Sequence, residues 1–222
     1  MSATIQNGLV KIPSGQVHME GMLEAPPNPA GIILFAHGSG SSRLSPRNNY
    51  VAQILREAGL ATLLLDLLTP QEDQQYRTRF DIALLSERLE AAAHWLQTEA
   101  AGLPRGLFGA STGAAAALQV AARPACAVKA VVSRGGRPDL AGDEALAQVR
   151  APTLLIVGGL DEAVIELNRT ACASLTGKKE LVIVPGATHL FEEPGKLEKV
   201  AGLARDWFLR HFTDIEAQDA AP

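Results

Sequence analysis

The stretch from Pro104 to Ala122, PRGLFGASTGAAAALQVAA, decides how the rest of the chain is interpreted. Its first residues, up to Phe108, form a short apolar run next to a proline, which is typical of a buried strand. Its last residues are rich in alanine, which favours a helix because alanine loses no side-chain entropy there. The sequence GASTG at 109–113 is therefore expected on a sharp turn from strand to helix. In that setting a G-x-S-x-G sequence predicts a strained serine whose hydroxyl projects from the turn.

Ser111, at the centre of this turn, is the candidate nucleophile. The flanking glycines lack a Cβ, so the helix can pass close to the strand. The N-terminus of that helix would direct free N–H groups and a positive dipole end at an oxyanion. The alternative is a Gly- and Ser-rich connection without chemistry, because the pentapeptide is common and depends on this context.

Length and composition point to one globular α/β domain covering residues 1–222, with a polar C-terminal tail from about residue 213. Hydrophobic residues make up 47% of the chain and charged residues 20%, which excludes a disordered protein. The formal net charge is −4 and the pI is about 5.7. A nucleic-acid partner is therefore not expected, because it would leave a basic surface patch in the sequence.

Neither a membrane segment nor a metal site is expected. The N-terminus, MSATIQNGLV, lacks the basic and apolar regions of a secretory signal, and no apolar run approaches the roughly 20 residues that span a bilayer. Cys126 and Cys172 have no metal-type spacing, and we interpret them as buried free thiols in a reducing compartment. The sequence thus predicts a cytoplasmic protein without metal or cofactor.

Strands and helices alternate along the chain. Strands are expected as a pair within 7–24 and at 31–36, 61–65, up to 108, 128–132, 153–157 and 180–184; helices are expected at 50–59, 80–101, after 113, and at 139–149, 163–175 and 196–212. The stretch 69–79 is polar, and no element is predicted for it. This alternation predicts an α/β fold with a mostly parallel sheet and helices on both faces.

Polar residues follow several of these strands directly. They are His37, Asp66, Ser111, Arg134, Asp161 and His189. In parallel sheets ligands bind outside the carboxyl ends of the strands, so these residues are expected to meet at one edge.

Three of them have the chain order of a catalytic triad, Ser111, then Asp161, then His189. A serine hydroxyl is a weak nucleophile and needs a base within hydrogen-bond reach. Imidazole titrates near neutral pH, so His189 can take the proton and return it. Asp161 would orient the ring and stabilise the imidazolium.

Other residues are alternatives for the same roles. Asp66 is an alternative acid, although a strand-end hydrogen bond explains it as well, and Glu162 suits the start of a helix. The remaining histidines are His18, His37, His94 and His211, and structural positions are the preferred interpretation for them.

The oxyanion of an ester reaction needs two preplaced donors. The backbone N–H of Thr112, next after the nucleophile, is one. The loop after the strand at 31–36 reads HGSG, and the N–H of Ser39 within it is the expected second donor. The other interpretation of this loop is a flexible turn.

Four arginines, Arg43, Arg47, Arg134 and Arg137, cluster in two loops expected to border the site. Arginine suits carboxylate or phosphate binding, so these residues are candidates for substrate binding. Surface salt bridges that brace the loops are the alternative.

Four motifs in order, HGSG at 37–40, GASTG at 109–113, GGLDE at 158–162 and GATHLF at 186–191, resemble an α/β-hydrolase of the dienelactone hydrolase-like group. The resemblance covers roughly residues 17–212 and implies an α/β-hydrolase fold with a sheet of about eight strands. The best-known dienelactone hydrolases use a cysteine nucleophile, and Ser111 at this position favours a serine-esterase-like mechanism. The segment GSGSSRLSPRN at 38–48 also resembles hydrolase segments fused to phosphoribosyltransferases. Some hydrolases of this fold carry a helical cap after the sixth strand, but the connection 133–139 is too short for one.

These observations predict a cofactor-independent serine hydrolase that cleaves a small ester, thioester or lactone through an acyl-enzyme. Its expected partner is that small molecule, with the chain as a monomer or homodimer. The alternative is a catalytically silent protein of the same fold that binds a ligand or assembles with another enzyme.

Overall fold

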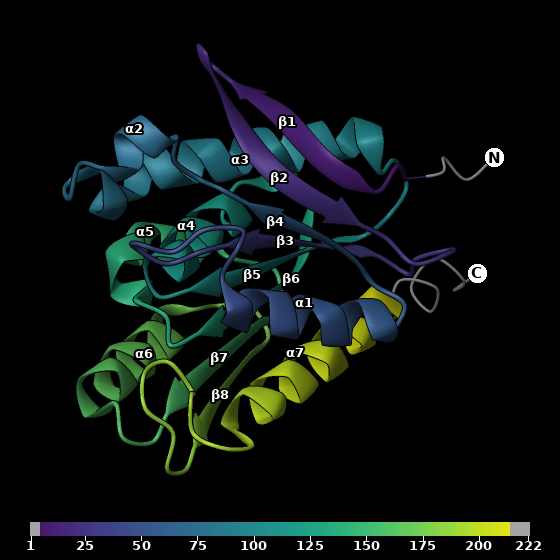
Figure 1. The fold of residues 1–222 in the computed structure, drawn as a ribbon. Helices are drawn as coiled ribbons and strands as arrows, with labels where there is room; N and C mark the ends of the chain where they lie inside the picture. Colours follow the sequence, from purple (N-terminus) through teal and green to yellow (C-terminus); the bar gives the residue numbers. More distant parts are fainter. Residues whose placement is uncertain (1–4, 214–222) are drawn as a thin grey trace.

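One sheet of eight strands runs through the molecule (Figure 1). The strands are β1 (Gly8–Ser14), β2 (Val17–Glu24), β3 (Ile32–Ala36), β4 (Ala61–Leu65), β5 (Arg105–Ala110), β6 (Val128–Arg134), β7 (Thr153–Gly158) and β8 (Lys179–Val184). They lie in the order β1-β2-β4-β3-β5-β6-β7-β8. β2 is antiparallel to β1 and β4, and all other neighbours are parallel. This computed structural model describes residues 5–213.

Helices cover both faces of the sheet (Figure 1). The α-helices are α1 (Pro46–Glu57), α2 (Pro70–Asp73), α3 (Ile82–Glu99), α4 (Thr112–Ala121), α5 (Asp143–Gln148), α6 (Glu162–Ser174) and α7 (Lys196–Thr213), and the 3-10 helices are η1 (Thr78–Phe80), η2 (Pro124–Cys126) and η3 (Pro138–Ala141). α1 and α7 pack together on one face, while α3, α4, α5 and α6 lie on the other. Among residues 5–213 no helix has the length and apolar character that a bilayer crossing requires.

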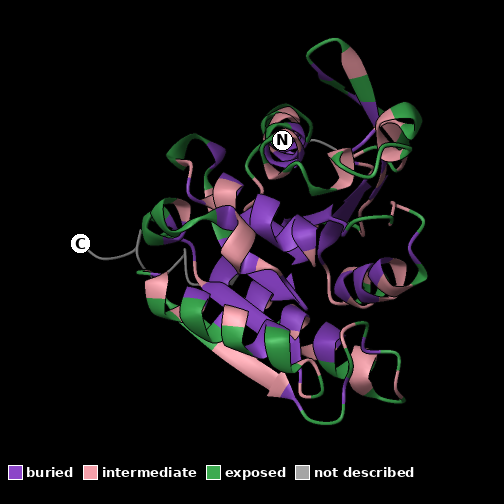
Figure 2. Cartoon of the chain, turned by 90° about the vertical axis from the view of Figure 1, so that its left-hand side faces the viewer, coloured by how far each residue is buried: buried purple, intermediate pink, exposed green. Residues whose placement is uncertain are grey.

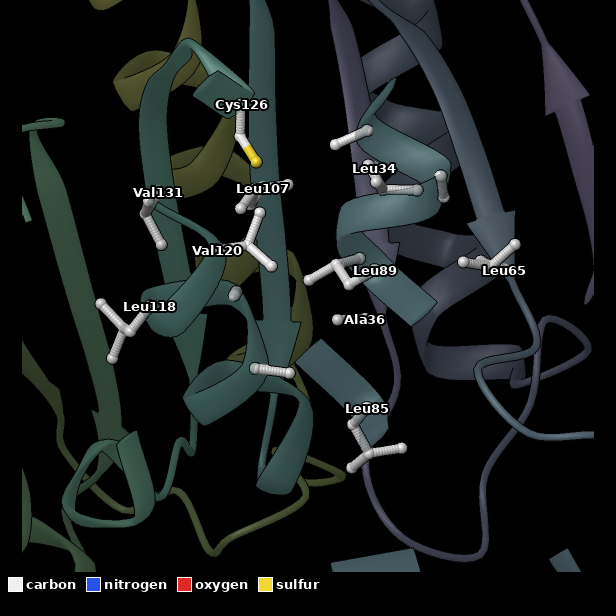
Figure 3. Close-up of a cluster of buried hydrophobic side chains, with 14 of the residues drawn as sticks. Leu34, Ala36, Leu65, Leu85, Leu89, Leu107, Leu118, Val120, Cys126 and Val131 are labelled. Atoms are coloured by element: carbon white, nitrogen blue, oxygen red, sulfur yellow. The ribbon is translucent and has the colours of Figure 1, made fainter. Parts of the chain in front are cut away.

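The central strands are buried on both faces, so successive residues feed two separate cores. In β3, Leu34 and Ala36 contribute to the core beneath α3 and α4, which Figure 3 shows, whereas Ile33 and Phe35 contribute to the core beneath α1 and α7. Figure 2 shows a buried centre between helices whose outer faces are exposed. A continuous apolar run such as GIILFA is what such a position requires.

The predicted fold class is confirmed, including the eight strands, the parallel arrangement and the missing cap. Only a short connection and η3 lie between β6 and α5, so nothing of cap size is inserted there. The polar tail expected from about residue 213 lies outside the described residues, which end with α7.

Several boundaries differ from the prediction. α1 begins at Pro46, earlier than the predicted Tyr50, because Ser45 caps it by accepting the Asn48 N–H (3.4 Å) and proline suits the first helical position. The stretch 69–79 contains α2 with a capping box between Thr69 and Glu72. The helix predicted at 139–149 is divided into η3 and α5 at residue 142, a glycine with φ of 84°.

Candidate active site

Ser111 occupies a strained turn between β5 and α4, with φ of 50° and ψ of −120°. A non-glycine residue with such angles is costly and persists only where its surroundings enforce it. The Ser111 N–H donates to the Arg134 carbonyl (3.3 Å), and the Ser111 carbonyl accepts the Arg137 N–H (3.1 Å). The end of β6 and the backbone that follows it therefore hold the turn in place.

The two glycines of the pentapeptide allow this turn. A Cβ on Gly109 would lie 2.4 Å from the Ala114 Cα, and one on Gly113 would lie 2.2 Å from the Ala36 carbonyl oxygen. Both distances are far inside van der Waals contact, so α4 meets β5 and β3 backbone to backbone. The G-x-S-x-G spacing is thus a packing requirement of this turn.

The structure joins two of the three predicted triad residues, His189 and Asp161, by a hydrogen bond. The His189 Nδ1 lies 2.6 Å from the Asp161 Oδ2, a hydrogen bond in which the ring nitrogen donates to the carboxylate. Asp161 is the N-cap residue of α6, but its side chain makes no capping bond, so its carboxylate is available to the ring. Within residues 5–213 the Ser111 hydroxyl makes no hydrogen bond to His189.

Ser111 and His189 nevertheless adjoin the same short segment. Ser111 bonds to the backbone of Arg134, and a Cβ on the next residue, Gly135, would lie 3.5 Å from the His189 Nδ1 and Cε1. Gly135 also has φ of 51°, which favours glycine. Hydrogen bonds of catalytic groups are often long without a substrate and tighten when one binds.

The loop that carries His189 is anchored on both sides of the ring. The Thr188 N–H donates to both oxygens of Glu193 (3.1 Å each), and this bond lowers the pKa of Glu193. Phe191 is fully buried and has φ of 58°, so its side chain fixes the far end of the turn. Apart from being close to His189 in the chain, neither Glu193 nor Phe191 is marked by a local sequence pattern.

His37 holds the loop that leads to Ser39. Its Nε2 accepts the Leu67 N–H (3.0 Å), so the proton must sit on Nδ1, which donates to the Gly38 carbonyl (2.9 Å). Burial lowers the pKa of His37, and the ring is neutral in this arrangement. His37 is therefore a structural residue, as expected.

Both predicted oxyanion donors belong to segments that adjoin the nucleophile, since Thr112 follows Ser111 directly in the chain. A Cβ on Gly38 would lie 3.0 Å from the Ser111 Cβ, so the loop passes directly beside the serine. Within residues 5–213 neither the Ser39 N–H nor the Thr112 N–H has an acceptor in the protein. Ser39, Arg79 and Thr112 line a narrow crevice that is too tight to admit a water molecule.

Three of the four candidate arginines are held in ion pairs. Arg43 pairs with Asp66 and with Glu20 (2.7 Å). Arg47 pairs with Glu192 (2.6 Å), and Arg137 pairs with Asp139 (2.7 Å). These contacts favour the loop-bracing interpretation for the three, and they also occupy Asp66, the alternative acid.

Arg134 is different, because it is buried and has no acidic partner among the described residues. One of its Nη atoms donates to Asn48 (3.4 Å), while its Nε and other Nη have no acceptor. Burial, followed by the neighbouring charge of Arg47, lowers the pKa of Arg134 to about 10. The predicted strand ends at residue 132, whereas β6 extends to Arg134. The burial of Arg134 was therefore not expected.

Large apolar side chains surround the candidate site. They are exposed on the loops at the carboxyl edge of the sheet, namely Leu44, Tyr76, Phe80, Leu160 and Leu190. A larger hollow of about 630 Å³ lies at the opposite end, lined by residues such as Pro27 and Leu103, and has no contact with these loops. Within residues 5–213 no cap-sized segment after β6 covers these side chains.

Relatives of this chain occur among curated proteins and among solved structures. No family model matches the chain. Two curated relatives from Mycobacterium tuberculosis, each named "Putative phosphoribosyl transferase", are 60% identical over 205 residues, which is 91% of this chain and 46% of theirs. The chain thus spans about half the length of the curated relatives it matches.

Solved structures match over almost their whole length. An α/β serine hydrolase without a lid from Xanthomonas campestris shares the fold, with 20% identity, a TM-score of 0.74, and coverage of 93% of this chain and 95% of that one. A dienelactone hydrolase from Anabaena variabilis is 55% identical with a TM-score of 0.89, covering 93% of this chain and 98% of that one. The chain is therefore an α/β-hydrolase and belongs to the dienelactone hydrolase family.

Proposed function

We propose that this hydrolase cleaves a small ester, thioester or lactone through a serine acyl-enzyme, without a cofactor. The observation that carries the proposal is the 2.6 Å bond between His189 and Asp161, held beside the strained Ser111. A histidine oriented by a carboxylate is the base that a serine hydroxyl needs to become a nucleophile.

In this mechanism the Ser111 oxygen attacks the carbonyl carbon while the His189 Nε2 takes the hydroxyl proton. Asp161 keeps the other ring proton on Nδ1 and stabilises the imidazolium. The ring then returns its proton to the leaving oxygen or sulfur, and an acyl-enzyme remains. A water activated by the same nitrogen attacks the acyl-enzyme, and Ser111 recovers its proton.

The Thr112 N–H and the Ser39 N–H would hold the oxyanion of both tetrahedral intermediates. Neither group has an acceptor within residues 5–213; Thr112 follows Ser111 in the chain, and the loop of Ser39 passes beside Ser111 at Gly38. One such donor is typically worth about 2.7–4 kcal/mol of transition-state stabilisation.

For the substrate we propose that Arg134, of the four candidate arginines, contributes an attractive charge to the site. Arg43, Arg47 and Arg137 already have carboxylate partners, whereas the charge of Arg134 has none. In kinetic terms, Arg134→Gln should raise KM for an anionic ester more than for a neutral ester of the same size. Equal effects on the two esters would contradict this assignment.

A panel of p-nitrophenyl esters of graded chain length, together with lactones, tests the reaction class. Wild-type protein should hydrolyse at least one of them, and Ser111→Ala should lose on the order of 10⁴-fold or more in kcat. Ser174→Ala, at the end of α6, is the matched control and should keep full activity. Turnover that survives Ser111→Ala would contradict the serine mechanism, while no turnover of any substrate would favour the silent binding or assembly protein.

A further inference from the structure

Three side chains of metal-ligand type lie together at the amino ends of the strands. Glu90 and His94 project from consecutive turns of α3, and Cys126 ends η2. One ligand atom from each residue lies within 4.8 Å of the others. Cys126 precedes β6 while Ser111 follows β5, so the cluster lies at the opposite end of the sheet, about 20 Å away by strand length.

Burial and a hydrogen bond hold Cys126 and Glu90 together. Cys126 is fully buried, and its Sγ donates to Glu90 (3.7 Å). Figure 3 shows its sulfur beside Leu107 at the margin of the core beneath α3. The Gln97 side chain donates to the Ala125 carbonyl (3.0 Å), which ties η2 to α3 one turn beyond His94.

We propose that Glu90, His94 and Cys126 form a zinc-binding site. Thiolate, imidazole and carboxylate are the three zinc ligands that proteins use, and three protein ligands leave the fourth tetrahedral position to water. Glu90 and His94 have i,i+4 spacing, which places them on one helix face. The sequence showed no metal motif because the thiol lies in a separate segment and only the fold brings it to α3.

The charges at the cluster determine how zinc would bind. Burial and the charge of Glu90 raise the pKa of Cys126 to about 11, so the thiol keeps its proton in the metal-free protein. Zinc binding replaces that proton, which is released to water, and forms the Zn–S bond. Arg123 pairs with Glu90 in the metal-free protein and is 40% exposed, so its guanidinium can move into water when zinc takes the carboxylate. The ligand atoms must approach by about 1 Å to reach tetrahedral separations near 3.5 Å.

The test uses the full chain, with Zn²⁺ titrated against a chromophoric chelator and Co²⁺ as a spectroscopic probe. Wild-type protein should bind one Zn²⁺ per chain, and Co²⁺ should give a thiolate charge-transfer band in the near ultraviolet. Cys126→Ser should abolish the band, and His94→Ala, an exposed position, should weaken zinc binding about tenfold or more. Cys172→Ser is the matched control and should bind like wild type.

Arg123→Gln should change the zinc affinity in the direction opposite to that of His94→Ala. Because it removes the cation that competes for Glu90, it should tighten zinc binding, whereas an adventitious surface site would not respond. Absence of micromolar zinc binding by wild-type protein, or equal binding by wild type, Cys126→Ser and His94→Ala, would overturn the proposal. Ser111→Ala should bind zinc unchanged, so the result is independent of the proposed hydrolase reaction.

Discussion

Asp161→Asn tests the bond on which the proposed mechanism depends. The change keeps the size of the side chain but removes its charge, and the Asp161 side chain is only 18% exposed, so the surroundings will hold the amide in place. An asparagine can present its NH₂ group to Nδ1, which favours the wrong tautomer of His189. The ring would then lack both its orienting acceptor and its countercharge.

The electrostatic part of the loss follows from Coulomb's law. With the charge centres of the imidazolium and the carboxylate about 4 Å apart and an effective dielectric constant of about 20, their attraction is about 4 kcal/mol. This attraction exists only once the ring has taken the serine proton, so it acts on the transition state. A loss of about 4 kcal/mol corresponds to a decrease in kcat of about a thousandfold.

The assay is kcat and KM on the best p-nitrophenyl ester, with circular dichroism to show that the variant is folded. We expect kcat to fall about a thousandfold with little change in KM, because the interaction is made mainly in the transition state. Glu162→Gln, which removes the adjacent exposed carboxylate, is the control and should stay within about threefold of wild type. A folded Asp161→Asn protein with nearly wild-type kcat would refute the proposed role of the acid.

Three further predictions concern stability. Gly113→Ala places a Cβ 2.2 Å from the Ala36 carbonyl oxygen and should lower the free energy of unfolding by about 2–3 kcal/mol, whereas Gly202→Ala, with no atom within 4 Å, should raise it by up to about 1 kcal/mol; urea unfolding measures both. Burial lowers the pKa of His37 in the folded protein from its ordinary value of 6.5, so below that pH the unfolded chain binds more protons than the folded one. The contribution of His37 to stability is therefore complete above pH 6.5 and is lost as the pH falls towards the folded-state pKa. His37→Gln should therefore reduce the slope of stability against pH in this acidic range, and an unchanged slope would show that another group causes it. Arg134→Met removes a buried charge without an acidic partner and should raise the free energy of unfolding by about 1 kcal/mol; a clear loss would mean that the Asn48 contact stabilises the fold.

Most of the fold could be predicted because its determinants are local. Runs such as GIILFA and ATLLL are apolar on both faces and interrupted by glycine or polar residues, so they predict central strands. The strand-to-helix turn at Ser111 was also predictable, since its two glycines are needed for close backbone contact. The predicted start of α1 was wrong, although the sequence Ser45–Pro46 is a helix-start signal.

Only those features of the site that follow from the order of the strands could be predicted. The parallel sheet brings Asp161 and His189 to one edge, and the short connection between β7 and α6 leaves the carboxylate free for the ring. The ion pairs of the arginines depend on partners such as Glu20 and Glu192, which are distant in the chain, so no local pattern indicated them. The buried state of Arg134 depended on where β6 ends, and helix or strand boundaries are the weakest part of sequence prediction.

Covalent labelling with a fluorophosphonate, followed by mass spectrometry of the digested protein, tests whether Ser111 is an activated nucleophile. An activated serine reacts with this reagent through its oxygen, which displaces fluoride from phosphorus. The proposed mechanism predicts one adduct per chain, located on Ser111, that is absent from Ser111→Ala and retained in Ser174→Ala. An unlabelled wild-type protein, or an adduct on another serine, would contradict this mechanism.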